Sequence, residues 1–288
     1  MTGSAISGDR RSPLPLAGVV GWPVAHSLSP FMMTRWLEAS GLPGSYAAFE
    51  VEPNRFSEAM GALSALSIRG VNITLPHKQA AMQIADTVSA AASAIGAANL
   101  LTTDERGRLH ADNTDHTGIE AALDELGLKP SDGPVVLVGA GGAARAALYV
   151  LKTAGWSDIR IVNRTPARAK ALAESFGVPA SIHALSDVEV ALKDAALVIQ
   201  SSSMGMANQA VFQPDLGGLP SNAGVFDMVY APLTTPLLAA ARACGLRTVD
   251  GLAMLIGQAR PGFELFFGAP PPKLDMRSLL AGALGLRR

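Results

Sequence analysis

Cysteine is almost absent from this sequence, which contains Cys244 alone among 288 residues. A single cysteine excludes an intramolecular disulfide and a cysteine-rich metal site, and we predict no bound metal. Cys244 falls near the end of an expected helix, where we predict that it is buried.

Long apolar runs and a charge excess are also missing. No segment has the roughly 20 consecutive apolar residues that span a bilayer, and the net charge is −1. We therefore expect no binding to nucleic acid or to membranes. The first dozen residues include Arg10 and Arg11 but no following apolar stretch, so we expect a loose terminus, no signal peptide and a cytoplasmic protein.

Apolar residues, by contrast, are plentiful, at 49% of the chain against 16% charged residues. This composition is typical of an enzyme with a sizeable core. The length favours one large domain or two ordinary ones.

The clearest pattern begins with the apolar run Val135–Val138, which predicts a strand buried on both faces of a parallel sheet. It leads into Gly139-Ala140-Gly141-Gly142-Ala143-Ala144, which fits the dinucleotide fingerprint G-x-G-x-x-A. The first glycine permits the tight turn, the second admits a pyrophosphate, and Ala144 keeps the following helix close to the strand. A second strand predicted at Ile159–Val162 provides the context that this motif needs.

The end of that second strand distinguishes NADP from NAD. Sites for NAD usually place a carboxylate there to hold the ribose 2′-hydroxyl. This sequence has Asn163-Arg164-Thr165 instead, and Arg164, with Arg168 one helical turn later, offers guanidinium groups to a 2′-phosphate. The alternative is that both arginines are solvated residues of a helix start, for which Thr165 and Pro166 form a capping pair.

Before the fingerprint, strands and helices alternate, which favours a parallel sheet. We predict strands at residues 16–20, 46–51 and 70–74 and helices at 29–40, 53–66 and 80–95, the last ending at Gly96. Residues 99–103 and 108–112 read as a hairpin with Gly107 in its turn.

Two serines stand before the first helix, in His26-Ser27-Leu28-Ser29-Pro30. Ser29 can be a helix cap and nothing more, whereas Ser27 is not needed as a cap. The pair suggests a loop that faces a polyol.

Lys78 and Asp115 are candidate catalytic residues, each with an ordinary alternative. Lys78 follows Pro76, where we expect a helix to start, and the positive end of the helix dipole makes this an unusual place for a lysine. Its position suits proton transfer, although spacing alone favours a surface lysine. Asp115 precedes the helix expected at 117–126 and can simply cap it. Strand alternation places Asn72 and Thr74 on one face and Val71 and Ile73 on the other.

After the fingerprint, the pattern predicts a six-strand doubly wound sheet. Its later strands fall at residues 180–183, 197–200, 225–229 and 247–249, and its helices at 166–176, 186–193 and from Pro236 to Gly245. We expect a helix at 251–267, interrupted at Pro261, and a terminal helix at 274–284. Both have no partner in that sheet, so we expect them to return to the first half of the chain.

Several motifs together resemble the shikimate dehydrogenase family, in family order and over nearly the whole chain. They are His26-Ser-Leu-Ser-Pro30, Asn72-Ile-Thr-Leu-Pro-His-Lys78, Gly96-Ala-Ala-Asn99, Asn113-Thr-Asp115, Gly139-Ala-Gly-Gly-Ala143, Asn163-Arg-Thr165, Asp227-Met-Val-Tyr230 and Gly251-Leu-Ala-Met-Leu-Ile-Gly-Gln258.

The resemblance implies an α/β enzyme, usually a homodimer, that interconverts 3-dehydroshikimate and shikimate with NADPH in aromatic amino-acid and chorismate biosynthesis. Its substrate-binding domain would comprise residues 1–111 and 252–288, and its Rossmann-type NADP-binding domain residues 112–251. Lys78 and Asp115 would be the catalytic pair. Substrate-binding positions would be Ser27, Ser29, Thr74, Lys78, Asn99, Asp115, Tyr230 and Gln258. Cofactor positions would be Gly139, Ala140, Gly141, Gly142, Ala143, Asn163, Arg164, Thr165, Arg168, Met228 and Gly251.

The implied substrate is a carboxylated cyclic polyol, and the residue types suit it. Ser27 and Ser29 can donate to the carboxylate, and Asn99, Asp115 and Gln258 can hold ring hydroxyls. Lys78 can protonate the ketone oxygen during reduction.

The sequence departs from the family pattern in three places. Met33-Thr34 replaces the usual His-Asn, Gln200-Ser201-Ser202 replaces Asn-Ala/Thr-Thr, and Ala111 replaces a glycine. We expect none of them to touch the chemistry directly. They leave open a quinate or aminoshikimate dehydrogenase. A non-catalytic NADPH-binding sensor is the alternative from another class, disfavoured because a sensor needs neither Lys78 nor Asp115. A reductase of the glutamyl-tRNA type needs a nucleophilic cysteine, and Cys244 is misplaced for that role.

Overall fold

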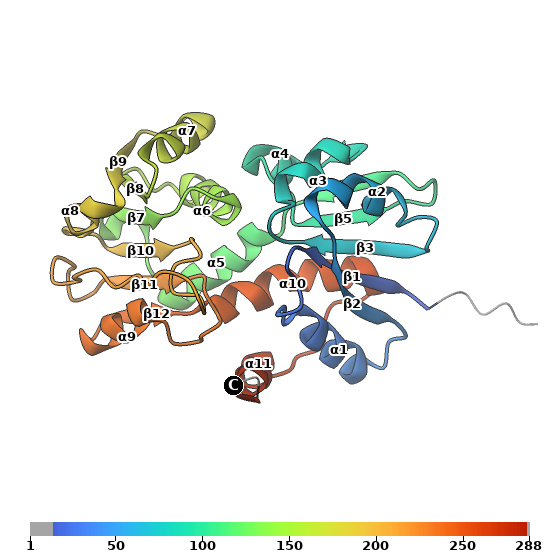
Figure 1. Ribbon diagram of the computed structural model, residues 1–288. Coiled ribbons are helices and arrows are strands. Elements are labelled where there is room, and N and C mark those ends of the chain that lie inside the picture. Colours follow the sequence, from blue (N-terminus) through green and yellow to red (C-terminus); the bar gives the residue numbers. More distant parts are fainter. Residues whose placement is uncertain (1–13, 287–288) are drawn as a thin grey trace, which may run out of the picture.

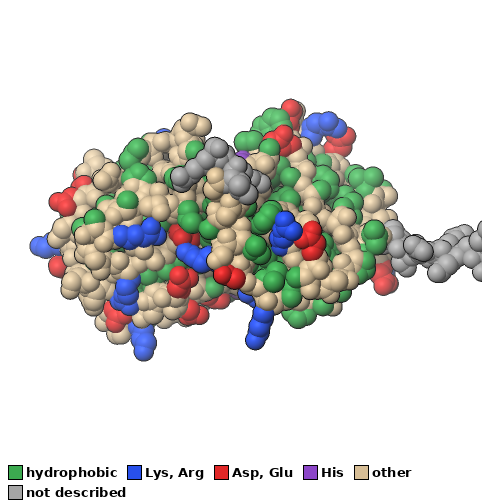
Figure 2. All heavy atoms as spheres, turned by 90° about the horizontal axis from the view of Figure 1, so that it is seen from below, with side chains coloured by type: hydrophobic (Ala, Val, Ile, Leu, Met, Phe, Trp, Pro, Cys, Tyr) green, Lys and Arg blue, Asp and Glu red, His purple; other side chains and the backbone are tan. Residues whose placement is uncertain are grey.

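The structure, a computed structural model, describes residues 14–286 and contains two six-stranded sheets in separate halves of the molecule (Figure 1). The prediction of a loose amino terminus without a signal peptide lies outside the described residues. None of the helices within residues 14–286 has both the length and the apolar character needed to cross a bilayer. On the face seen in Figure 2, side chains of both charge signs are interspersed among apolar and uncharged ones.

The first sheet is mixed, with the strand order β2-β1-β3-β5-β6-β4. Strand β1 pairs in parallel with β2 and β3, so the predicted parallel core is confirmed, whereas β5 runs antiparallel to β3 and β6. The hairpin is confirmed as well, with Gly107 in the left-handed region at φ 76°. The strands are β1 (Leu16–Gly21), β2 (Ser45–Glu50), β3 (Ile68–Ile73), β4 (Thr87–Val88), β5 (Leu100–Thr103) and β6 (Leu109–Asp112).

The first helix of this half has its predicted bounds, Ser29–Ser40, whereas the other two expected helices are shorter or divided. The helix expected at 53–66 is a 3₁₀ turn at Pro53–Arg55 followed by α2. The helix expected at 80–95 is wrong, because β4 divides it: the Asp86 carboxylate accepts the Leu109 N–H at 2.8 Å, and the Ser89 hydroxyl caps the next helix. The helices are α1 (Ser29–Ser40), α2 (Phe56–Gly61), α3 (Lys78–Ile84) and α4 (Ala90–Ile95).

The second sheet is entirely parallel, with the order β12-β11-β10-β7-β8-β9, which confirms the doubly wound prediction. Its central strand β7 is buried throughout, and alternate residues face different helix layers: Val135 and Leu137 pack with α5 to α7, and Val136 and Val138 pack with α8 and α9. The strands are β7 (Val135–Val138), β8 (Ile159–Asn163), β9 (Ala180–Ala184), β10 (Leu197–Gln200), β11 (Gly224–Asp227) and β12 (Arg247–Val249).

The helices of the second half follow their predicted positions with a few corrections. The helix expected at 186–193 is a 3₁₀ turn at Leu185–Asp187 and a short α8, and Cys244, predicted to be buried, is exposed at the end of α9. Thr165 occupies the cap position of α7 but its side chain makes no capping bond. The helices are α5 (Asp115–Leu126), α6 (Gly142–Thr153), α7 (Pro166–Phe176), α8 (Val188–Leu192) and α9 (Pro236–Ala243), and another 3₁₀ turn lies at Pro130–Asp132.

The carboxyl-terminal helices α10 (Gly251–Phe267) and α11 (Met276–Leu286) return to the first half, as expected (Figure 1). Helix α10 packs against α5, α1 and β3. It continues through Pro261, so the expected interruption is wrong. Proline cannot donate to the carbonyl of Gly257 four residues earlier. The Thr117 hydroxyl of α5 shares its one proton between that carbonyl, at 3.3 Å, and its own helix's Thr114 carbonyl, at 2.8 Å.

Helices α5 and α10 touch at the backbone. A Cβ atom at Gly118 would lie 2.3 Å from the carbonyl oxygen of Met254, and one at Gly257 would lie 2.8 Å from the Gly118 Cα. The Thr114 hydroxyl donates to the Gln258 carbonyl at 2.8 Å beside this contact. Two glycines therefore let α10, which leads back to the first sheet, lie directly on the helix that leads into the second.

We expect Gly118→Ala to lower the free energy of unfolding by about 1–3 kcal/mol, because the added methyl group must displace the backbone of α10. Gly282→Ala in α11 is the matched control, since a Cβ there meets nothing within 4 Å; it should be neutral or stabilising by about 0.5–1 kcal/mol. Urea unfolding of both variants measures the difference. Equal effects would show that the close approach of α5 and α10 has no energetic weight.

Candidate active site

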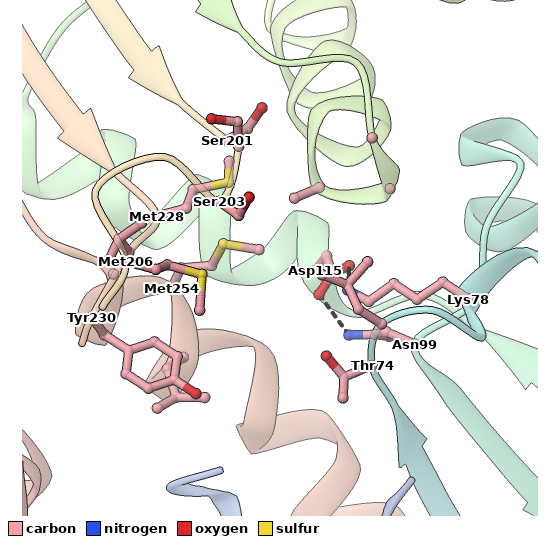
Figure 3. Close-up of a pocket in the computed structure, with 18 of the residues that line it drawn as sticks. Thr74, Lys78, Asn99, Asp115, Ser201, Ser203, Met206, Met228, Tyr230 and Met254 are labelled. Atoms are coloured by element: carbon pink, nitrogen blue, oxygen red, sulfur yellow. Dashed lines mark hydrogen bonds and ion pairs between the residues drawn. The ribbon is translucent and has the colours of Figure 1, made fainter. Parts of the chain in front are cut away.

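A cavity of about 430 Å³ opens between the two sheets, where α10 passes from one to the other. In Figure 3, Lys78, Asn99, Thr74 and Asp115 lie on one side, and Ser201, Ser203, Met206, Met228 and Met254 lie on the other. Most of the residues predicted from the sequence line this single cavity. They are Ser27, Ser29, Thr74, Lys78, Asn99, Asp115, Tyr230, Gln258, Gly139, Ala140, Gly141, Gly142, Ala143, Asn163, Arg168, Met228 and Gly251.

Two predicted cofactor residues, Arg164 and Thr165, are not among the residues that line the cavity. Both are exposed beyond the end of β8. Arg168, one turn further along α7, does line it. The described geometry therefore favours Arg168 over Arg164 as the cation nearest to a bound ligand.

Lys78 and Asp115 form an ion pair within the cavity (Figure 3). They are 37 residues apart in the chain, and each is the first residue of its helix, α3 and α5. Their side chains are 14% and 4% exposed, so the pair is largely removed from water. The surface interpretation of Lys78 is wrong, and Asp115 does not cap α5 with its side chain. Helix α3 begins at Lys78 itself and not at Pro76 as expected.

Asn99 holds the carboxylate of this pair in place. The two hydrogens on its Nδ2 are shared among three acceptors: Asp115 Oδ1 at 2.9 Å, Thr114 Oγ1 at 3.1 Å and Gln258 Oε1 at 3.1 Å. Its Oδ1 accepts the Thr114 N–H at 2.7 Å. One buried amide thereby connects the start of β5 with α5 and α10, and both oxygens of Asp115 have partners.

Ser27 and Ser29, at the start of α1, both line the cavity. Leu28 occupies the cap position, and the Ser27 hydroxyl accepts the Ser29 N–H at 3.2 Å. The Ser29 side chain makes no capping bond and lines the cavity in a buried position. The interpretation of Ser29 as a cap alone is therefore wrong.

The glycine-rich turn lies beside Lys78. A Cβ on Gly142 would come within 3.5 Å of Lys78 Cδ, so the amino terminus of α6 and the ion pair share one wall. Gly139 has φ 114°, and a Cβ there would lie 2.6 Å from the Ser201 hydroxyl. At Gly141 a Cβ would meet nothing within 4 Å, so the backbone before α6 is open on the cavity side. This turn can admit a pyrophosphate at a helix amino terminus.

Sequence reasoning missed several residues that line the cavity. Ser201 and Ser202, taken as departures without contact to the chemistry, both line it, whereas Met33 and Ala111 are buried in apolar clusters. The Gln200 side chain, wholly buried, donates to the carbonyls of Ser202 and Met204 and accepts the Ser202 N–H at 2.6 Å. Ser201 and Ser202 directly follow β10, at the carboxyl edge of a parallel sheet, where ligands usually bind. This position could have identified them from the sequence. Other unpredicted lining residues include His26, Asn72, Ser203, Met206 and Met254.

Asn72 is the most informative of these omissions. It is buried, it lines the cavity, and its Nδ2 has no hydrogen-bond partner within the described residues. Strand alternation predicts it on the same face as Thr74, a predicted substrate residue. A buried amide donor without a partner is costly, and this atom has almost no accessible surface.

Asp227, at the end of β11, holds the loop that carries Met228 and Tyr230 into the cavity. Its Oδ1 accepts the Val229 N–H at 3.0 Å and its Oδ2 accepts the Thr235 hydroxyl at 2.7 Å. Burial raises the pKa of Asp227 to about 6 from its ordinary value of 3.8; the two hydrogen bonds oppose this rise, and the negative charge of Asp250 adds to it.

Asp227→Asn should change how stability depends on pH. Between about pH 4 and pH 6 the folded protein retains a proton on Asp227 that the unfolded chain releases, so the stability of the parent falls as pH rises through this window. Moving the pKa from 3.8 to about 6 corresponds to about 3 kcal/mol. Asparagine does not titrate, so the stability of the variant relative to the parent should rise between pH 4 and pH 7. Urea unfolding at several pH values measures this, and the same change in the exposed control Asp124→Asn would contradict it.

Comparison with known proteins gives a consistent result. Residues 19–101 match the family model described as the shikimate dehydrogenase substrate binding domain, residues 120–213 match shikimate / quinate 5-dehydrogenase, and residues 251–280 match the shikimate 5'-dehydrogenase C-terminal domain. The shikimate dehydrogenase (NADP(+)) of Mesorhizobium japonicum is 46% identical over 270 residues, which cover 93% of this chain and 96% of that one.

Solved structures agree. The shikimate 5-dehydrogenase of Thermus thermophilus in complex with NADP(H) and shikimate is 37% identical, has a TM-score of 0.82 and is matched over 95% of this chain and 99% of that chain. The quinate dehydrogenase of Corynebacterium glutamicum in complex with NAD is 31% identical, has a TM-score of 0.83 and is matched over 93% and 98%. With three family models along its length and these relatives over nearly all of it, the chain belongs to the shikimate dehydrogenase family.

Proposed function

We propose that this chain is an NADP-dependent oxidoreductase that interconverts 3-dehydroshikimate and shikimate. The observation that carries the proposal is the buried ion pair of Lys78 and Asp115, which lies in one cavity with a dinucleotide-binding turn. The relatives named shikimate dehydrogenase (NADP(+)) and the Thermus thermophilus complex with NADP(H) and shikimate support the choice of cofactor and substrate.

When bound, NADPH supplies a hydride to the ketone carbon of the substrate. As that carbon is reduced, negative charge develops on the ketone oxygen. Lys78 stabilises this charge and gives the oxygen a proton, and in the reverse direction it takes the proton back. Asp115 keeps Lys78 oriented through their ion pair, and Asn99 fixes Asp115 in turn. The Lys78 side chain is only 14% exposed, so little water screens its charge. Its electrostatic interactions with Asp115 and with the ketone oxygen are therefore stronger than they would be in water.

The polar residues of the first half can hold a carboxylated ring. Ser27, Ser29 and Thr74 are hydroxyl donors for the carboxylate. Asn99, Asp115 and Gln258 are partners for ring hydroxyls. Tyr230 reaches the cavity from the opposite side (Figure 3).

The second half fits a bound NADP. The proposed contacts are Gly139, Ala140, Gly141, Gly142, Ala143, Asn163, Arg164, Thr165, Arg168, Met228 and Gly251. The end of β8 offers Asn163 and two arginines in place of the carboxylate that NAD sites use. The open backbone at Gly141 and the amino terminus of α6 suit the pyrophosphate.

The same proposal includes the division of the chain. Residues 1–111 with 252–288 would bind the substrate, and residues 112–251 would bind NADP, with closure of the cleft between them during turnover. The packing of α10 on α1 and β3 supports this division. A cytoplasmic homodimer that serves aromatic amino-acid biosynthesis completes the proposal and follows from the family resemblance.

Quinate is the second candidate substrate, because a relative 31% identical is a quinate dehydrogenase. Ser201 and Ser202, which depart from the family pattern, line the cavity. A panel of shikimate, quinate and aminoshikimate, each with both nicotinamide cofactors, separates the candidates by kcat/KM. The highest value for shikimate with NADP+ is expected.

For the role of Lys78, we expect Lys78→Ala to lower kcat about 10²–10⁴-fold in NADPH oxidation with 3-dehydroshikimate, because a positioned proton donor is lost. NADPH affinity should change little. The control is Lys170→Ala, whose side chain is 72% exposed in α7. If Lys78→Ala keeps the parent kcat, the assigned role is wrong. If the parent binds NADPH but turns over no member of the panel, the protein is a sensor and the proposed activity fails.

For the choice of cofactor, Arg168→Ala should raise the KM for NADPH about ten-fold or more, because a charge-assisted hydrogen bond to the 2′-phosphate is lost. The KM for NADH should change little. Arg164→Ala should show the same preference with a smaller effect, since Arg164 is not among the lining residues. Equal losses for NADPH and NADH would argue against a 2′-phosphate contact.

A further inference from the structure

Arg145 connects the two halves of the molecule outside the cavity. It is the fourth residue of α6, in the half that contains the second sheet, and its Nε donates to the carbonyl of Ile95, the last residue of α4, at 2.5 Å. Helices α4 and α6 are in contact (Figure 1). Guanidinium nitrogens only donate, so the direction of this bond is unambiguous. Arg145 is not among the described residues that line the cavity, so it influences a bound ligand only through its neighbours.

The carboxyl end of α4 accommodates the guanidinium group. Gly96, which follows Ile95, has φ 73°, and a Cβ there would lie 2.3 Å from Arg145 Nη2. A glycine at this position therefore leaves the room that the guanidinium occupies. Carbonyls at a helix carboxyl terminus carry partial negative charge, which favours a cation beside them.

Contacts within the second half hold the other side of the guanidinium. Its Cζ lies 5.3 Å from the centroid of the Phe176 ring, and its Nη1 donates to the Ser175 hydroxyl at 3.5 Å. The Arg145 backbone N–H donates to the Gly141 carbonyl at 3.0 Å, which forms the first helical bond of α6 directly after the dinucleotide turn. The side chain is therefore anchored to α6 and α7 on one side and bonded to α4 on the other.

The segment 95–99 that accepts this bond also supports the ion pair. The Ala98 N–H donates to the Lys78 carbonyl at 2.8 Å. Asn99 donates to the Asp115 carboxylate at 2.9 Å. One short stretch of backbone thus contacts the supports of both charged residues and, through Ile95, the helix that follows the dinucleotide turn.

The reaction requires a set spacing between this turn and the ion pair. A Cβ on Gly142 would come within 3.5 Å of Lys78 Cδ, so the turn and the pair already lie close together. In the proposed reaction the hydride and the proton go to the carbon and the oxygen of one carbonyl group. Such groups must be held within roughly 0.5 Å of their productive geometry.

We propose that Arg145 is a positioning residue that connects the amino terminus of α6 to the segment 95–99 and so holds a bound nicotinamide cofactor at a set distance from Lys78. The inference rests on the proposed function for the identity of the cofactor and of the reaction. Without the bond to Ile95, α6 can move away from α4, and the spacing between the cofactor and Lys78 is no longer fixed on this side of the cavity.

Kinetics of Arg145→Met test the proposal, because methionine keeps an apolar stem and removes every donor. We expect kcat for NADPH oxidation with 3-dehydroshikimate to fall about 10–100-fold, since small displacements of reacting groups are costly. NADPH affinity, measured by fluorescence titration without substrate, should change little, because the dinucleotide turn lies wholly in the second half. Arg145→Lys keeps the charge and one donor group, so it should recover part of the lost kcat.

Arg160→Met is the matched control. Arg160 of β8 also donates to backbone carbonyls, those of Ala191 at 2.8 Å and Lys193 at 2.5 Å, but all three residues belong to the second half. Its loss should leave kcat at the parent value.

Two kinetic results would overturn the proposal. One is a kcat of Arg145→Met equal to that of the parent. The other is a weaker affinity of this variant for NADPH, which would show that Arg145 shapes α6 itself and not its spacing from α4. If urea unfolding shows that Arg145→Met is not folded, Arg145→Lys takes its place under the same two criteria.

A distance measurement separates this inference from the proposed function. Cys244, exposed at the end of α9, and Ser57→Cys, at an exposed position of α2, carry two spin labels, one in each half of the molecule (Figure 1). Without ligands, the distribution of the distance between the labels should broaden in Arg145→Met and stay unchanged in Arg160→Met. An unchanged distribution in Arg145→Met would overturn the positioning role. If the parent does not turn over shikimate while the distribution broadens in Arg145→Met, the proposed function fails and the link between α6 and α4 stands.

Discussion

The pairing of Lys78 with Asp115, whose side chains are both largely buried, is the constraint on which the rest of the structure depends. A buried charge pair is costly unless its remaining donors and acceptors are satisfied. Asn99 meets this need by donating to Asp115, while Thr114 holds the other end of the Asn99 amide. Each charged residue opens a helix, so the geometry of the pair depends on where α3 and α5 begin.

Those helix starts are set by long-range packing. Helix α5 leads into the second sheet, α10 leads back out of it, and the two lie backbone to backbone at Gly118 and Gly257. The same pair of helices brings Gln258 to Asn99. The contact of α5 with α10 thus helps to hold the polar network of the first half against the dinucleotide turn of the second, together with the hydrogen bond from Arg145 of α6 to the Ile95 carbonyl of α4.

Patterns that depend on local chemistry could be predicted from the sequence. The Gly139–Ala144 turn, strand β7 and the doubly wound order follow from apolar periodicity and glycine placement, and motif resemblance supplied Lys78 and Asp115. The Ala-rich run at 80–95 could not be resolved, because helix propensity is high throughout it while its interruption depends on β4 pairing with the distant β6. Asn72 was missed for a related reason: its significance lies in an absent partner, which only the assembled cavity reveals.

The hydrogen bond from Thr117 to the Gly257 carbonyl links the substitutions that residues 117 and 261 can tolerate. Pro261 leaves that carbonyl without its helical donor, and a hydroxyl on α5, shared with the Thr114 carbonyl, supplies a partial replacement. Loss of the hydroxyl should cost less stability where residue 261 carries an N–H that can bond the Gly257 carbonyl, because that carbonyl then keeps a donor. Residues 117 and 261, far apart in the sequence, should therefore tend to change together during evolution.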